Sequence, residues 1–255
     1  MKKLKYLLLT VLVSCAFVLA GCGDGQLGAK ANVNIGNTSD YVAAEAQDRE
    51  AFNALINNAE AVDVSAYRIT MDMSMDMYGV VMTMNYNAIF ATVEEDFQMA
   101  VKLDANMAGE SQSAKMWIKE NVVYVESSDL AEMLNDSKVK MNIDSELAEE
   151  LTSSLEELKA FDLAEMLNMV RTADVNETLI KVNKEDTTTR YELTMDQSGV
   201  IATMYLVFEN DVLTGCQMST NTMGMDVVVT ISAFEGEIEF PDPAGFTDLS
   251  DFMGY

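Results

Sequence analysis

The sequence predicts an α+β fold built on an antiparallel sheet of about ten strands. From Tyr67 onward, apolar and polar residues alternate with a period of two, which indicates strands with one buried and one solvated face. Short turns connect consecutive strands, as in an antiparallel meander. Two regions with a helical period, 41–61 and 128–171, stand before the strands and between them.

The first expected element is a helix over 41–61. Phe52, Leu55 and Ile56 form an apolar stripe along it, and Ser39 or Asp40 is expected to cap its start. Strands are then expected over 67–77, 82–87, 97–107, 113–119 and 121–126. In the first of them, we expect the odd-numbered residues from Met71 to face the helices and the even-numbered residues to face outward, because the opposite register would bury aspartates.

The region 128–171 is expected to form helices. Its segments 129–132 and 162–165 both read Asp-Leu-Ala-Glu, which is typical of a helix start, and leucines between them form a helical stripe. Strands are expected to resume over 176–183, 189–196, 200–208, 211–219 and 223–234. The chain then leaves regular structure at Pro241-Asp242-Pro243.

The first 22 residues have the order of a bacterial secretory signal. Three lysines in the first five residues precede an apolar run over 7–19, which at about 13 residues is short for a membrane span. The run closes with Leu19-Ala20-Gly21-Cys22, which resembles the lipobox of bacterial lipoproteins. The resemblance implies cleavage before Cys22 and a diacylglycerol thioether on this residue, with palmitate or another acyl group on its new amino group. The protein is then exported and lipid-anchored to the outer face of the cell membrane.

The chain accordingly divides into three parts. Residues 1–21 are the expected signal peptide. Residues 22–39 comprise the acylated Cys22 and a flexible linker rich in Gly, Asn, Ser and Ala. Residues 40–255 form the expected folded domain. Among the three cysteines, Cys15 leaves with the signal and Cys22 is blocked, so no disulfide is expected.

Composition excludes several classes of function. The formal net charge is −26, and removal of the signal takes away three lysines and no acid, which makes it −29. Nucleic acid is therefore excluded as a partner. The chain has no histidine, so Ser-His-Asp and Cys-His sites are excluded. We expect a protein that is not an enzyme and needs no cofactor.

The order of elements resembles the LolA/LolB-like architecture and LppX-type envelope lipoproteins. The resemblance covers roughly residues 41–245 and includes the closing strand and proline-containing exit at 237–243. It implies a strongly curved antiparallel sheet, an open half-barrel, whose concave face is covered by helices. It also implies an apolar cavity for acyl chains or another hydrophobic ligand. No catalytic residues are carried over.

Methionine is the notable residue of the candidate cavity, because its unbranched, polarizable side chain can repack around variable ligands. The candidate lining residues are Met71, Met73, Met75, Met77, Met82, Met84, Met99, Val101 and Leu103. The alternative interpretation is that each of these side chains is ordinary core.

The sequence supports a metal site less well than it supports an apolar cavity. Thioethers suit Cu(I), but neighbours on one strand lie about 6.6 Å apart, so a site needs cross-strand partners such as Met82 and Met84. The acidic clusters lack the spacing of a calcium loop and are interpreted as solvated surface.

Two functional hypotheses remain from the sequence. The first is a carrier or binding lipoprotein for a lipid or other hydrophobic envelope ligand. The second is a surface interaction protein with a filled core that binds another envelope protein. A continuous apolar cavity favours the first, and a fully packed interior favours the second.

Overall fold

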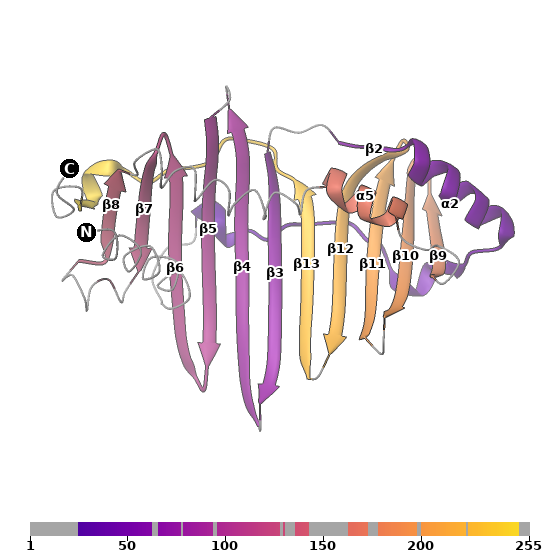
Figure 1. Ribbon diagram of the computed structural model, residues 1–255, viewed down its shortest axis with the longest axis horizontal. Helices are drawn as coiled ribbons and strands as arrows, with labels where there is room; N and C mark the ends of the chain where they lie inside the picture. Colours follow the sequence, from indigo (N-terminus) through magenta and orange to yellow (C-terminus); the bar gives the residue numbers. More distant parts are fainter. Residues whose placement is uncertain are drawn as a thin grey trace.

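One sheet of fourteen strands runs through the part of the chain that the computed structural model describes (Figure 1). The described residues are 25–62, 66–77, 79–93, 96–127, 130, 136–142, 163–172, 178–197, 200–222 and 224–249. The long strands are β3 (Ala66–Met77), β4 (Val80–Val93), β5 (Asp96–Met107), β6 (Glu110–Lys119), β7 (Val122–Ser127), β8 (Lys138–Asn142), β9 (Leu179–Glu185), β10 (Thr188–Gln197), β11 (Val200–Glu209), β12 (Val212–Thr222) and β13 (Met225–Ala233). The short elements are β1 (Val42–Ala43), β2 (Glu60–Ala61), β14 (Thr247–Asp248), the helices α2 (Ala46–Asn58) and α5 (Leu163–Thr172), and the 3-10 turns η1 (Gly25–Gly28), η2 (Thr38–Asp40) and η3 (Pro243–Gly245).

Two antiparallel meanders make up the sheet. Strands β3 to β8 form one and strands β9 to β13 form the other, and they join where β13 pairs with β3 in the middle of the sheet. Tight turns connect the hairpins. At Glu120 and Asn121, for example, both residues have positive φ (50° and 63°), as a two-residue hairpin turn requires. The predicted alternating strands are confirmed, and the alternation follows the pleat.

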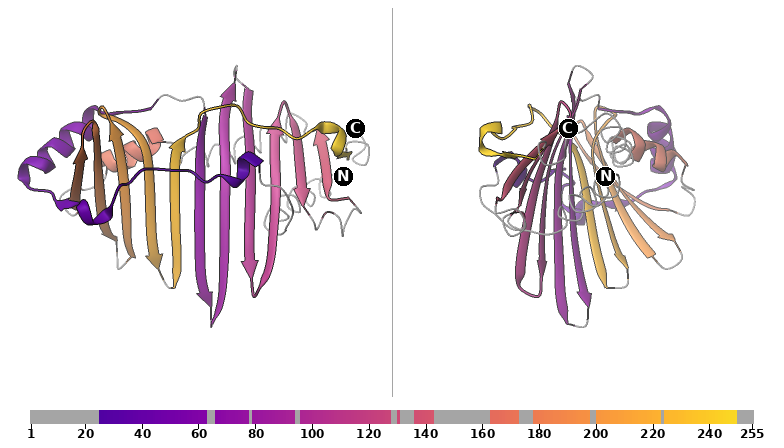
Figure 2. Two further views of the ribbon diagram at one scale, coloured as in Figure 1. Left: turned by 180° about the vertical axis from the view of Figure 1, so that it is seen from behind. Right: turned by 60° about the vertical axis from the view of Figure 1, so that its left-hand side comes forward.

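The predicted curvature is wrong. The described sheet is open and twisted rather than a strongly curved half-barrel, and it has more strands than predicted (Figures 1 and 2). Strong curvature requires bulges or kinks in the strands. The long strands β3, β4 and β5 instead pair without a register shift, whereas a shift occurs between Val207 and Phe208 in β11. With two described α-helices beside this sheet, the fold is mostly β.

Helices α2 and α5 lie on the same face of the sheet, which we call the helix face (Figure 2). The helix predicted over 41–61 is shorter, because Val42–Ala43 and Glu60–Ala61 are strands. It begins with a capping box between Glu45 and Asp48, not at Ser39 or Asp40. At its end, the Arg171 guanidinium of α5 donates to the carbonyl oxygens of Ile56 (2.9 Å) and Ala59 (2.6 Å). This contact joins the two helices.

The region predicted to be helical over 128–171 is helical in its described last part, Leu163–Thr172. Within the same region, Lys138–Asn142 forms strand β8 and pairs with β7. The leucine stripe between the two Asp-Leu-Ala-Glu segments lies outside the described residues.

The main core lies on the helix face. Phe52 and Ile56 of α2 and Met166 and Leu167 of α5 pack against the apolar side chains of the sheet. Tyr191 of β10 has an edge-to-face contact with Phe52, with 4.8 Å between the ring centroids. Helices and sheet therefore bury one continuous apolar layer.

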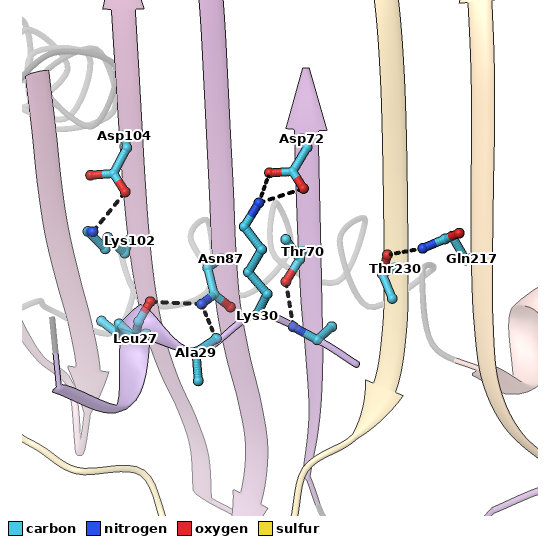
Figure 3. A network of polar contacts seen from close by, with 11 residues as sticks. Leu27, Ala29, Lys30, Thr70, Asp72, Asn87, Lys102, Asp104, Gln217 and Thr230 are labelled. Carbon is cyan, nitrogen blue, oxygen red and sulfur yellow. Dashed lines mark hydrogen bonds and ion pairs between the residues drawn. The ribbon is translucent and has the colours of Figure 1, made fainter. Parts of the chain in front are cut away.

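The opposite face of the sheet carries the two ends of the described chain, and we call it the strap face. Residues 25–39, predicted to be part of a flexible linker, lie against this face (Figure 3). Asn87 of β4 donates to the carbonyl oxygens of Leu27 (2.8 Å) and Ala29 (2.5 Å), and Leu27 is buried. Thr70 accepts from the Ala31 N–H. Hydrogen bonds to backbone carbonyl oxygens hold this segment against the sheet. Every sequence has such carbonyl groups, so the composition of the segment is that of a linker although the segment is bound.

From Leu27 the N-terminal segment crosses toward β9. Val33 packs over Gly215 of β12, and Arg190 of β10 donates to the Asn34 carbonyl oxygen at 2.8 Å. The C-terminal segment, 234–249, crosses from β3 toward β8 (Figure 2). Its residues Phe234, Phe240 and Phe246 are six positions apart and each lies near a cation of the sheet, respectively Arg68, Lys119 and Lys138.

The two segments meet in the middle of the strap face. The Gln26 side chain donates to the Glu237 carbonyl oxygen (2.8 Å) and accepts from the Glu239 N–H (2.9 Å). At the edges of the sheet, β1 pairs with β9 and β14 pairs with β8. The two segments thus span the strap face between them.

Candidate functional site

The helix face extends along the long central strands past the helices, and this extension is rich in methionine. The register places two rungs of side chains there. One rung runs Met225, Met75, Met82 and Met107 across β13, β3, β4 and β5. The next runs Val227, Met73, Met84 and Ala105. We call the methionines of these two rungs the methionine ladder.

The orientation predicted for β3 is confirmed. Met71 packs against the core on the helix face, so Met73 and Met75 share that face. The even-numbered Thr70 and Asp72 lie on the opposite face, but they are not simply exposed. Thr70 is buried under the N-terminal segment, and Asp72 accepts from Lys30 (Figure 3).

The side chains of the helix face become less buried along the central strands, from the core toward the methionine ladder. Met99, Val101 and Leu103 are buried in the core. Met71 is partly buried at the border of the core. The predicted residues farther along are Met73, Met75, Met82 and Met84, all partly exposed. Met107, at the end of its rung, is 57% exposed. The residues predicted to line a cavity therefore divide into core residues and residues of an apolar surface. The side chain of Met77 lies outside the described part of the structure.

The ladder includes two methionines that the candidate list did not contain, Met107 and Met225. Met107 continues the alternation of its strand, so the sequence carries a signal for it. Met225 reaches the ladder because β13 pairs with β3 across a long sequence separation. Alternation within one strand carries no information about such a pairing.

A tyrosine stands between the ladder and the core. Tyr86 pairs with Met71 on one side and Leu103 on the other. Burial, with a smaller contribution from Tyr67, raises the pKa of the Tyr86 phenol far above its usual value. The phenol is therefore neutral under physiological conditions, and this part of the face carries a hydroxyl but no charge.

Two hollows are formed by described residues, and neither is lined by the methionine ladder. A hollow of about 470 Å³ lies between α5, the chain around β2 and the start of β3. Its apolar lining includes Ala59, Val62, Tyr67, Leu163 and Leu167. A second hollow, of about 380 Å³, is lined mainly by polar residues of β4, β5 and β6, among them Asn85, Asp104 and Ser113. These belong to the strap face.

The described residues contain no group of three or more Cys, Asp and Glu side chains placed to hold a metal ion. The Cys216 thiol is buried, and burial raises its pKa to about 12. The register does place Met84 opposite Met73 and Met82 opposite Met75, the cross-strand arrangement that a Cu(I) site requires.

The region of the lipobox lies outside the described residues, and with it Cys22. Within the described part of the chain, neither helix has the length and apolar character to cross a bilayer.

Comparisons with known proteins give distant structural similarity only. No family model matches the chain, and no curated protein matches it significantly. A DUF1329 family protein from Desulfovibrio piger is similar at 12% identity and a TM-score of 0.25, covering 75% of this chain and 92% of that one. A protein provisionally named AttH from Nitrosomonas europaea is similar at 6% identity and a TM-score of 0.24, covering 73% of this chain and 58% of that one. These similarities concern the large β-sheet alone.

Proposed function

We propose that this protein is a lipid-anchored, non-catalytic envelope protein that binds a hydrophobic ligand, such as an acyl chain, on the methionine ladder. The observation that carries the proposal is the ladder itself. It is an apolar surface that continues the core of the helix face but is left partly exposed. Contiguous apolar surface of this kind is uncommon on soluble domains unless it binds something.

The type of residue supports a variable apolar ligand. Methionine side chains are flexible and polarizable, so they adapt to chains of different length. The neighbouring Tyr86 is neutral, so the border between the ladder and the core carries no charge at this position. The hollow beside α5 adds apolar surface at the other end of β3, near Tyr67.

The anchor is proposed from the sequence alone. Leu19-Ala20-Gly21-Cys22 after an apolar run supports lipidation of Cys22 and a place on the outer face of the cell membrane. Replacing Cys22 by Ala is expected to leave the protein unprocessed or released into the medium. Stable membrane retention of a correctly cleaved Cys22→Ala protein contradicts the anchor.

Ligand binding is tested on the soluble chain 25–255 with a neutral fluorescent probe, N-phenyl-1-naphthylamine. A neutral probe is needed because chain 25–255 carries 13 Lys and Arg against 41 Asp and Glu, and this net charge of −28 repels anionic fatty acids anywhere on the surface. Met73→Gln with Met75→Gln removes apolar surface without adding charge. We expect probe affinity to fall by at least about fivefold, since loss of about 1 kcal/mol corresponds to that factor.

Two control variants isolate the ladder. Met73→Leu with Met75→Leu keeps the surface apolar and is expected to retain binding. Ser74→Gln lies between these positions but on the strap face, and is also expected to retain binding. Equal binding by all variants, or none by the parent chain, refutes the ligand site. In that case, capture of a second envelope protein by the same surface becomes the better hypothesis.

A further inference from the structure

The point where the anchor joins the fold is fixed in the middle of the strap face. Gln26 bonds to the C-terminal segment, and its own carbonyl oxygen accepts from Arg68 of β3 at 3.0 Å. The next residue, Leu27, is 4% exposed and its carbonyl oxygen is held by Asn87 of β4. Turn η1, which contains both residues, contacts β4 and β5.

Little chain separates this point from the proposed lipid. Cys22 precedes Gln26 by four positions, and an extended chain spans at most 3.3–3.6 Å per residue. The lipidated residue therefore lies within about 14 Å of Gln26. A tether of this length is short compared with the sheet.

The sheet extends farther than the tether in three directions and about as far as the tether in the fourth. From β4, six strand spacings lead to β9 and four lead to β8, which at about 4.8 Å each gives about 29 Å and about 19 Å. Along the strands, Gln26 is held by Arg68, which pairs with Ile89 of β4; Ile89 lies nine residues from Val80 and four from Val93, or about 30 Å and about 13 Å. A sheet standing on either outer strand or on the Val80 end needs more chain than the tether provides, and one standing on the Val93 end needs the tether at nearly its full extension.

We infer that the lipid anchor holds this protein flat against the bilayer, with the strap face toward the lipid headgroups and the methionine ladder directed away from them. The inference rests on the lipid anchor of the proposed function but not on the ligand site. The tether itself sets the orientation, because the acidic protein gains no attraction to anionic lipid. The partner of the strap face is the surface of the protein's own membrane.

The orientation can be measured with single cysteines on the lipidated protein. Cys216 is 1% exposed with a raised thiol pKa, and Cys22 is blocked by lipid, so an introduced cysteine reacts selectively. Neighbouring positions on one strand face opposite sides. Ser111 (strap face) and Glu110 (helix face) form one pair on β6, and Ile201 (strap face) and Val200 (helix face) form another on β11.

Each single-cysteine variant is labelled with a fluorophore and reconstituted into phosphatidylcholine vesicles that carry a nitroxide on the headgroup. Vesicle flotation is checked first, and a protein that does not float refutes the anchor and the orientation together. For floating protein, we expect Ser111→Cys and Ile201→Cys labels to be quenched at least twice as strongly as Glu110→Cys and Val200→Cys labels. Insertion of ten Gly and Ser residues after Asp24 is expected to remove this difference.

Other patterns overturn the orientation while leaving the anchor intact. Equal quenching within each pair but unequal quenching between β6 and β11 indicates a sheet standing on one edge. Equal quenching of all four labels indicates a domain that tumbles freely or stands on a strand end. Stronger quenching of the Glu110→Cys and Val200→Cys labels indicates that the methionine ladder faces the bilayer.

Discussion

Replacing Asn87 by Ala tests how firmly the N-terminal segment is bound. The Asn87 amide of β4 is 7% exposed and donates to two carbonyl oxygens of the segment, those of Leu27 and Ala29 (Figure 3). Each such hydrogen bond contributes about 0.5–1.5 kcal/mol net. The Leu27 side chain is buried, and loosening the segment also exposes part of it. We expect the variant to lose about 2 kcal/mol of the free energy of unfolding.

The measurement is urea unfolding of chain 25–255, followed by far-ultraviolet circular dichroism and by the fluorescence of Trp117. This tryptophan is the only one in the sequence and is buried on the strap face next to Phe246, so it reports on that face. A loss of about 2 kcal/mol corresponds to a fall in melting temperature of about 4–8 °C for a chain of this size.

Asn85→Ala is the matched control. Asn85 is two residues away on the same strand and face, but it lines the open polar hollow. We expect its substitution to change the free energy of unfolding by less than about 0.5 kcal/mol. Equal effects of the two substitutions, or an Asn87→Ala effect below about 0.5 kcal/mol, refute the claim that Asn87 holds the segment.

Further predictions concern the strap face and the buried titratable groups. Gly215→Ala places a Cβ atom 2.7 Å from Cγ2 of Val33, so a loss of about 1–3 kcal/mol is expected in urea unfolding, and Val33→Ala in the same chain should restore much of it. Cys216 is expected to react with a thiol reagent at pH 8 only after unfolding, because burial raises its pKa to about 12; rapid reaction of the native chain contradicts this. The raised pKa values of Cys216 and Tyr41 favour the protonated folded state, so their stabilising contribution is complete below pH about 9 and is lost as the pH rises toward 12. A urea midpoint that stays constant over this interval contradicts that linkage.

The sequence predicted the local parts of this fold well. Alternation of Met with Asp, Ser and Thr in β3 predicts a strand, its register and the face of each residue, because a one-residue slip buries aspartates. Turns such as Glu120-Asn121 follow from local chemistry as well. The described methionines of β3 and β4 (Met71, Met73, Met75, Met82 and Met84) were therefore expected on one face, and they lie there.

Non-local features were harder to predict. The β13–β3 pairing, which brings Met225 to the ladder, joins segments more than 140 residues apart, and hydrophobic period alone does not specify a partner. The predicted curvature came from a family resemblance rather than from any bulge in the long strands. Binding of residues 25–39 depends on the buried amide of Asn87 and on backbone carbonyl oxygens, which leave no composition signal.

The short strands at the two ends of the sheet have a consequence for crowding. Unpaired strand edges are templates for pairing with other chains. Here β1 pairs with Val182 and Lys181 of β9, and β14 pairs with Val139 and Lys140 of β8. In the membrane-bound orientation that we propose, copies of the protein would meet in two dimensions at high local concentration, and flat neighbours would meet edge to edge. By occupying part of both edges, the two ends of the chain restrain lateral polymerisation into a continuous sheet.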